Sequence, residues 1–270
     1  MGKLRVGIKP SRTSFVKKKN LKMKLSFLLL FFPFLLFAQE QENQAIKDQF
    51  SLEGLLDLCQ KSNNPEELEK RLNSPETAIH NFDLNADAQV DYLNVEEVTE
   101  GQLHILFIRT MLNEQESQDI AWIEIEKTGE QQAFIKAMAD SALFEEALAL
   151  EPIDEKEMNN KGKGGPMPFE VAPAFVRVNV WGWPLVRTIY APAYRPWRSP
   201  WRYRQLPPWY APRKPVSVIV FKPRMNPYKM MYRPVPFRPA AGAHRLYKMH
   251  RRQAKMAHRH HHRGKQQRRR

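Results

Sequence analysis

Residues 103–139, LHILFIRTMLNEQESQDIAWIEIEKTGEQQAFIKAMA, decide the fold. Runs rich in Val, Ile, Phe, Tyr and Trp alternate here with polar residues, and the polar separators 113–118 and 128–129 are typical of hairpin connections. A similar run precedes them. The predicted strands are 90–98, 103–112, 119–127 and 132–139. Strands joined by such short connections pair antiparallel, so the sequence predicts a four-stranded meander.

Short helices are predicted before these strands. The first follows Ser51, a favoured cap residue, because apolar residues recur at helical spacing as far as Cys59. The second opens at Asn64-Pro65, where Asn is a cap and Pro fits the first helical position. A third start signal, Ser74-Pro75-Glu76, predicts one further helical turn. The expected fold class is therefore α+β, with two or three short helices packed on one face of the meander.

The first residues indicate export. Residues 25–38, LSFLLLFFPFLLFA, form an apolar run of 14 that follows a lysine-rich start and precedes a polar segment. This pattern predicts a basic leader and signal peptide over residues 1–38, with Met23 as an alternative start. The run is shorter than the roughly 20 residues that span a bilayer, so we expect no integral membrane span after cleavage. An uncleaved signal anchor is the alternative, and the expected location is the periplasm or the cell surface.

Charge divides the chain into three parts. Residues 1–38 hold 9 basic residues (Lys and Arg) and no acidic ones. Residues 39–160 hold 8 basic and 28 acidic residues, and residues 161–270 hold 26 basic residues and 1 acidic residue. Asymmetry of this size concerns partners and self-association, although the acidic and basic parts can also neutralise each other. After the leader, the expected parts are an acidic α+β domain (46–158), a Gly-rich linker (159–166), a Pro/aromatic/Arg-rich extended region (167–240) and a basic His/Arg-rich disordered tail (241–270).

The region after the linker is expected to bind a polyanion. It holds 15 of the 21 prolines, a density that forbids helix and central strand and favours extended chain. Arginine offers a planar fork to phosphate, sulfate or carboxylate, and aromatic rings stack on sugars or bases or lie at a membrane surface. The candidate residues are Arg195, Trp197, Arg198, Trp201, Arg202, Tyr203, Arg204, Trp209 and Tyr210. In the alternative, the rings fold back onto the sheet and the arginines pair with the acidic domain.

An oxygen-rich loop, DLNADAQVDY at residues 83–92, is the candidate metal site. Calcium takes six to eight oxygen ligands, which a tight loop with an oxygen at every second residue can supply. Loop 83–94 resembles the calcium loops of EF-hands, dockerins and integrin-type propellers, and departs from them at Ala88 and Asn94. That resemblance implies calcium as a cofactor. The implied ligands are Asp83, Asn85, Asp87, Gln89 and Asp91. Without calcium, the same string is an Asx-turn that leads into the strand.

Catalysis is not expected. A single cysteine excludes an internal disulfide and a Cys-built zinc site, and helical spacing places Cys59 in the core. His80 and His104 stand alone, and the serines lack His and Asp partners in their sequence context. The histidines at 258–262 suit nickel, copper or zinc, but Arg interrupts the run and its charge opposes a cation.

The order of these features is similar to that of a family. The helical lead, the D-x-N-x-D-x-x-x-D-Y loop, the strand 118–127, the junction KGKGGP at 161–166 and the tail VNVWGWP at 178–184 resemble a family of uncharacterised exported bacterial proteins over residues 46–215. The resemblance implies export and domain order alone.

We expect an exported, non-enzymatic envelope or surface protein whose basic aromatic tail binds an envelope polyanion such as lipopolysaccharide, acidic polysaccharide or extracellular DNA. Two alternatives remain: a partner of another envelope protein by strand addition, and a calcium- or metal-binding envelope protein.

Overall fold

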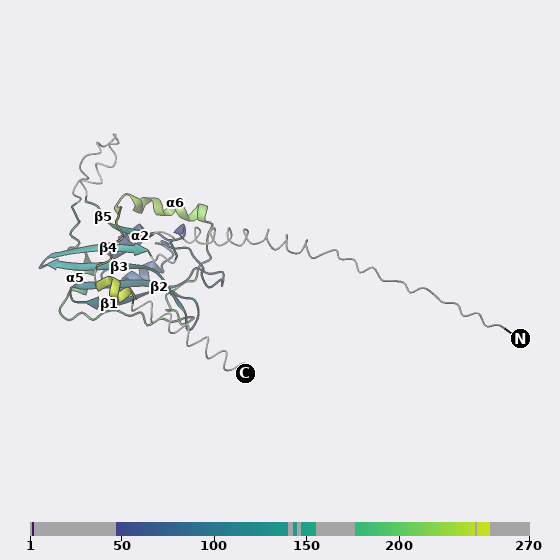
Figure 1. Cartoon of the computed structure of the whole chain (residues 1–270). Helices are drawn as coiled ribbons and strands as arrows, with labels where there is room; N and C mark the ends of the chain where they lie inside the picture. Colours follow the sequence, from purple (N-terminus) through teal and green to yellow (C-terminus); the bar gives the residue numbers. More distant parts are fainter. Residues whose placement is uncertain are drawn as a thin grey trace, which may run out of the picture. The chain divides into compact units, whose positions relative to one another are not determined.

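Six strands form one antiparallel sheet in the order β1-β2-β3-β4-β5-β6 in the computed structural model (Figure 1). The strands are β1 (Leu93–Glu100), β2 (Leu103–Met111), β3 (Ser117–Gly129), β4 (Gln132–Ala139), β5 (Ala149–Pro152) and β6 (Tyr232–Val235). Besides Gly2, the structure describes residues 47–154 without 140–142 and 145–146, and residues 176–248 without 241. The expected signal peptide at 1–38, the linker at 159–166 and the histidines at 258–262 lie outside these residues.

The α+β class is confirmed, but the prediction of four strands was wrong by two. The four predicted runs form β1 to β4, and β2 is buried on both faces of the sheet. β5 and β6 were missed because each has only four residues and each contains a proline, which disfavours a strand assignment. They pair with each other across about 80 residues of chain, and no local pattern reports such a pairing.

The two leading helices begin where the caps predict. In α2 (Leu52–Lys61), Ser51 Oγ accepts the N–H of Gly54 at 2.9 Å. In α3 (Pro65–Leu72), Asn64 Oδ1 accepts the N–H of Glu67 at 2.8 Å. The third predicted helical turn is only a turn over residues 75–77, because the backbone takes a positive φ of 41° directly afterwards.

The proline-rich region folds onto the acidic domain. It forms α5 (Pro184–Ile189), α6 (Val218–Lys229) and β6, and α6 lies next to α2 (Figure 1). Seven of its side chains are buried in the same core as α2 and α3: Val180, Leu185, Val186, Ile189, Phe221, Met225 and Tyr232. The sequence predicted an extended region over 167–240, with folding back as the alternative. In the structure residues 176–240 fold back and include two helices, although much of their backbone is irregular. Apolar side chains among the prolines supply the reason, since their burial is favourable.

The second face of the sheet is covered as well. Trp122 of β3 stacks on Tyr247 with ring centroids 4.6 Å apart, and Phe237 meets it edge-on at 5.7 Å. Residues 242–248, placed by the sequence in a disordered tail, are helical and bury Ala243 and Leu246 against this face. Both faces of the central strands are therefore covered by other parts of the chain, and neither face is exposed for a partner to bind.

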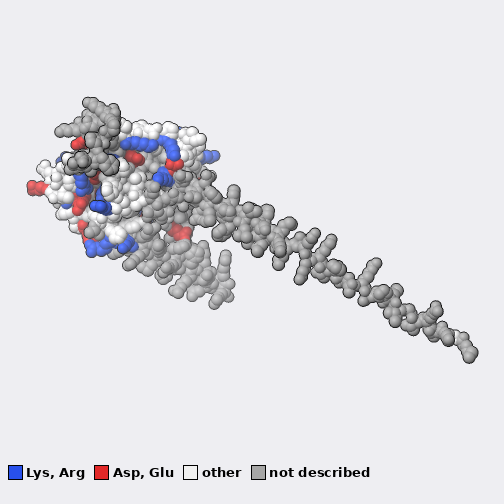
Figure 2. Space-filling view, turned by 45° about the horizontal axis from the view of Figure 1, so that its top comes forward, with Lys and Arg blue, Asp and Glu red and all other residues white. Residues whose placement is uncertain are grey.

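Charge pairs also join the two regions. Between described residues, the salt bridges that connect them are Arg177–Glu151, Arg198–Glu96, Lys222–Asp48, Arg233–Glu151 and Arg245–Glu100. On the face drawn in Figure 2, basic and acidic side chains lie next to one another. Part of the charge asymmetry seen in the sequence is thus neutralised within the fold.

Candidate functional site

The aromatic segment at 190–210 lies along the outer edge of the sheet. The N–H of Glu97 in β1 donates to the carbonyl of Trp197 at 2.8 Å, and the N–H of Ser199 donates to the carbonyl of Val95 at 3.1 Å. An uncovered edge strand would expose unpaired backbone groups, so this segment protects β1. The contact also fixes which side chains of the segment face the sheet.

A buried carboxylate of α3 anchors this segment. Glu69, 2% exposed, accepts hydrogen bonds from the hydroxyl of Tyr92 at 2.8 Å and the N–H of Val95 at 2.9 Å. It also accepts from the hydroxyl of Ser199 at 2.8 Å and from the indole of Trp197 at 3.3 Å. Burial raises the pKa of Glu69, while these donors lower it. Four donors around one carboxylate make this a structural junction.

A second buried carboxylate holds the start of the segment. Glu97 accepts the hydroxyl of Tyr194 and, at 2.9 Å, the N–H of Trp197. Its other oxygen lies 2.5 Å from Nδ1 of His104, whose ring meets that of Tyr190 edge-on at 4.6 Å. His104 therefore has a carboxylate partner that the sequence did not indicate. The same contacts give Trp197, a predicted polyanion-binding residue, a role in packing.

The arginines of the segment are exposed. Arg195, Arg202 and Arg204 are exposed and form no salt bridge with any residue that the structure describes. Arg198 pairs with Glu96 at 2.9 Å while its side chain stays 77% exposed. Of the predicted rings, Trp201 and Tyr203 are half-buried, and Trp209 is 41% exposed. The fold thus sorts the predicted site into rings that are partly buried and arginines that are exposed.

The oxygen-rich loop is closed by its own hydrogen bonds. Asp83 accepts the N–H groups of Asp87 and Ala88 at 3.1 and 2.7 Å, and Asn85 Oδ1 accepts the N–H of Asp87 at 2.9 Å. These are Asx-turns. Ala88 has a φ of 66°, the conformation for which calcium loops use glycine. The described structure therefore shows the turn, with the backbone bent as a calcium loop requires.

Asp91 closes the loop at its base. It is 4% exposed and accepts the N–H of Leu84 at 2.7 Å and the amide of Asn85 at 2.8 Å. Burial, and then the charges of Asp83 and Asp87, raise the pKa of Asp91 to about 7. None of the three carboxylates pairs with a basic side chain of the described residues. In that part of the chain, no group of three or more His, Cys, Asp or Glu side chains has the arrangement of a formed metal site.

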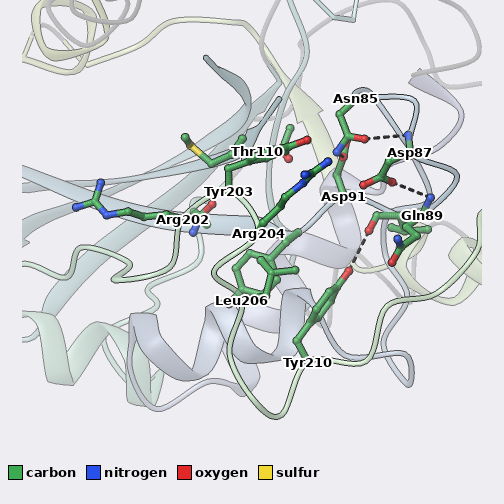
Figure 3. Close-up of a pocket in the computed structure, with 14 residues that line it drawn as sticks. Asn85, Asp87, Gln89, Asp91, Thr110, Arg202, Tyr203, Arg204, Leu206 and Tyr210 are labelled. Carbon is green, nitrogen blue, oxygen red and sulfur yellow. Dashed lines mark hydrogen bonds between the residues drawn. The ribbon is translucent and has the colours of Figure 1, made fainter. Parts of the chain in front are cut away.

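One pocket joins the two predicted sites, which the sequence kept separate. It has a volume of about 360 Å³, and its walls come from the oxygen-rich loop, from β1 and β2, and from residues 202–210 (Figure 3). Its lining is Asn85, Asp87, Gln89, Val90, Asp91, Tyr92, Asn94, Thr110, Met111, Arg202, Tyr203, Arg204, Leu206 and Tyr210. An acidic wall thus faces a basic and aromatic one.

Arg204 has an unusual backbone conformation in this pocket. Residues 202–205 form a tight turn in which the N–H of Gln205 donates to the carbonyl of Arg202 at 2.9 Å. Arg204 is the third residue of the turn and has a φ of 61°, where glycine or asparagine is preferred. Its side chain extends toward Asn85 and Asp91, whereas Arg202 points away from the loop (Figure 3). The turn therefore presents a single guanidinium group to the acidic wall.

Sequence reasoning missed the strand residues of the pocket. Tyr92 directly precedes β1 and Asn94 is its second residue, while Thr110 and Met111 end β2, where Thr110 pairs with Leu93 in the antiparallel register. Alternation assigns such residues to a sheet face, and it carries no information about which other segment lies over them. The only sequence signal was that Tyr92 and Asn94 lie within loop 83–94, the stretch that resembles a calcium loop.

No protein-family model, no curated protein and no solved structure matches the chain. Among the described residues, no helix is both long and apolar enough to cross a bilayer. Cys59 is fully buried, and burial raises the pKa of its thiol well above the usual range, which confirms the core assignment.

Proposed function

We propose that this chain is an exported, non-enzymatic protein of the envelope or cell surface that binds a polyanion such as lipopolysaccharide, acidic polysaccharide or extracellular DNA. The observation that supports the proposal most is the sorting of segment 194–204, in which the rings are half-buried against the fold and the arginines are exposed. A folded segment that presents arginines loses less conformational freedom on binding than a disordered one. We propose that the basic residues at 249–270 also bind the polyanion.

Three guanidinium groups carry the proposal within the described residues. Arg195, Arg202 and Arg204 are free of salt bridges there, so binding an anion does not require breaking an internal pair. Each offers a planar fork that matches carboxylate, sulfate or phosphate. Arg198 differs, since Glu96 already occupies its fork at 2.9 Å. This difference supplies a matched control within one segment.

Strand addition to another envelope protein has less support. The aromatic segment covers β1, and β6 at the other edge has four residues with Pro234 among them. A short edge with a proline offers few donors to an added strand.

Salt dependence tests the polyanion proposal. The affinity of the purified full-length chain for a DNA duplex, for lipopolysaccharide and for polygalacturonate is measured between 50 and 300 mM salt, a range chosen because counterion release acts there. Affinity for the polyanion that binds should fall steeply with salt. Arg195→Gln and Arg202→Gln should each lower the slope of log K against log salt by about 1, and Arg198→Gln by less. Absence of binding at low salt, or binding that ignores salt, would refute the proposal.

We also propose a calcium site on loop 83–91 as a second candidate. It is favoured by three carboxylates, Asp83, Asp87 and Asp91, that converge without a basic partner in the described residues, and by the positive φ of Ala88. Millimolar calcium should raise the melting temperature of the full-length chain. Asp87→Asn should abolish that rise, and Glu114→Gln, at an exposed acid outside the loop, should keep it. The absence of both a binding heat and a thermal shift would rule the site out.

A further inference from the structure

We propose that the pocket between the oxygen-rich loop and the 202–205 turn binds an acidic sugar, a hexuronate unit of an acidic polysaccharide. The proposal rests on the proposed polyanion binding and narrows it to one ligand class. It is carried by the walls of the pocket, which bring a guanidinium group toward hydrogen-bond acceptors and have aromatic rings on a further side (Figure 3).

The basic wall is one side chain. Arg204 reaches into the pocket, and its guanidinium carbon lies 5.2 Å from the centre of the Tyr203 ring, which leaves the edge of the fork open. It forms no salt bridge with a described residue, although acidic side chains line the same pocket. A carboxylate seated between the walls would accept two parallel hydrogen bonds from this fork.

The opposite wall accepts hydrogen bonds. Asp91 is held in place by Leu84 and Asn85, and each of its carboxylate oxygens accepts one hydrogen bond and has a further lone pair. Asp87 uses one oxygen for the N–H of Gln89 and is exposed. Sugar hydroxyls can donate hydrogen bonds to these acceptor oxygens. A hexuronate ring carries its carboxylate at one end and hydroxyls at the other, so it satisfies both walls at once.

The remaining wall is aromatic. Tyr210 is fixed by its hydroxyl, which donates to the carbonyl of Val90 at 2.9 Å, and its ring meets that of Tyr92 edge-on at 5.1 Å. Tyr203 and Leu206 complete this side. Rings held rigidly offer flat apolar surface to the C–H face of a sugar at little entropic cost. A free amino acid could also match both charged walls, but it has no flat ring to use these surfaces.

Size and charge argue against the other polyanions. A volume of about 360 Å³ is near the lower end of the roughly 300–1,000 Å³ typical of small-ligand sites, so one or two sugar units fit. In a nucleic acid the charge lies on the backbone phosphates and not on the rings, so a ring seated in the pocket would bring no carboxylate to the Arg204 fork. An acidic polysaccharide has its charges on rings separated by neutral hydroxyl groups.

The Arg204→Gly variant tests the effect of this side chain on binding separately from its effect on folding. Glycine favours the φ of 61° at this position, so the variant should fold, and circular dichroism with a urea titration checks this. Binding of trimeric oligogalacturonate to the full-length chain is measured by calorimetry in EDTA, which excludes a calcium bridge on the loop. Maltotriose is the neutral match, and free glutamate is the zwitterionic competitor. Arg187→Gln, at an exposed position of α5 outside the pocket, is the control variant.

The expected result is that Arg204→Gly weakens binding of the oligogalacturonate by about tenfold or more, the loss typical of a charge-assisted fork, while Arg187→Gln changes the affinity less than about threefold. Arg204→Lys should fall between them. Maltotriose should bind at least about tenfold more weakly than the uronate. Equal binding by Arg204→Gly and the unaltered chain, equal binding of maltotriose, or displacement by glutamate would overturn the inference. Salt-sensitive binding of DNA or lipopolysaccharide without uronate binding would also overturn it and would leave the proposed function standing.

Discussion

Removal of the basic half should unfold the acidic half. A chain that ends at residue 160 keeps α2, α3 and β1 to β5, the elements that the sequence alone assigns to a domain, and loses everything that the later region adds. It loses the seven side chains that are buried in one core with α2 and α3, the partner strand of β5, and the donors that Glu69 and Glu97 receive from residues 194–199. A chain that ends at residue 248 keeps all of these and is the matched control.

The size of the effect follows from burial. Val180, Leu185, Val186, Ile189, Phe221, Met225 and Tyr232 are each at most 6% exposed. At roughly 1.5–3 kcal/mol for each buried side chain, they contribute on the order of 10–20 kcal/mol. Whole domains of this size are stable by only about 5–15 kcal/mol, so the shorter chain should have no stable fold.

Circular dichroism and urea unfolding distinguish the two chains. The chain ending at 248 should unfold cooperatively, and the chain ending at 160 should show no cooperative transition. A point-mutation pair checks the same reasoning in the full-length chain. Phe221→Ala should cost about 3–5 kcal/mol, and Ile219→Ala, at an 85% exposed position, less than about 0.5 kcal/mol. Cooperative unfolding of the shorter chain at the control's urea midpoint would refute the assignment of one shared core.

Three further predictions concern single residues. Glu69→Ala should lower the free energy of unfolding by about 3–5 kcal/mol in a urea titration, because four buried donors lose their acceptor, and Glu69→Gln should cost less. Arg204→Gly should keep the free energy of unfolding or raise it by up to about 1 kcal/mol in a urea titration, because a left-handed φ is unfavourable for arginine. A clear loss of stability would contradict this. Burial, and then Arg213, lower the pKa of His80 to about 3, so the unfolded chain binds more protons below pH 6.5 and stability is lost as pH falls from there. His80→Gln should make that loss shallower by about 1.4 kcal/mol per pH unit over pH 4–5.5, measured as urea unfolding against pH; parallel curves would refute it.

Much of the acidic domain was predictable because its signals are local. Ser51 and Asn64 begin helices since each cap contacts residues only three positions away. The four predicted strands form because alternation and short connections specify hairpins without reference to the rest of the chain. Cys59 is buried because helical spacing places it on the apolar face of α2.

The candidate site was predictable in its parts and not in its assembly. The oxygen-rich loop and the arginines were both singled out, and the structure places Asp91 and Arg204 in one pocket although they are more than 100 residues apart. The sequence suggested the binding role for rings and arginines alike. Packing separates their roles, because the indole of Trp197 donates to the buried carboxylate of Glu69, while Arg204 forms no salt bridge with a described residue.

By itself, the sequence determined the α+β class, the helix starts, the core strands and the separation of charge, because each depends on composition or on spacing over a few residues. Only the tertiary structure decided that the proline-rich region completes the core, that the acidic carboxylates hold its rings, and that a left-handed arginine faces the oxygen-rich loop. The physical reason is that proline removes the periodicity from which burial is inferred, while the apolar side chains between the prolines still gain by leaving water.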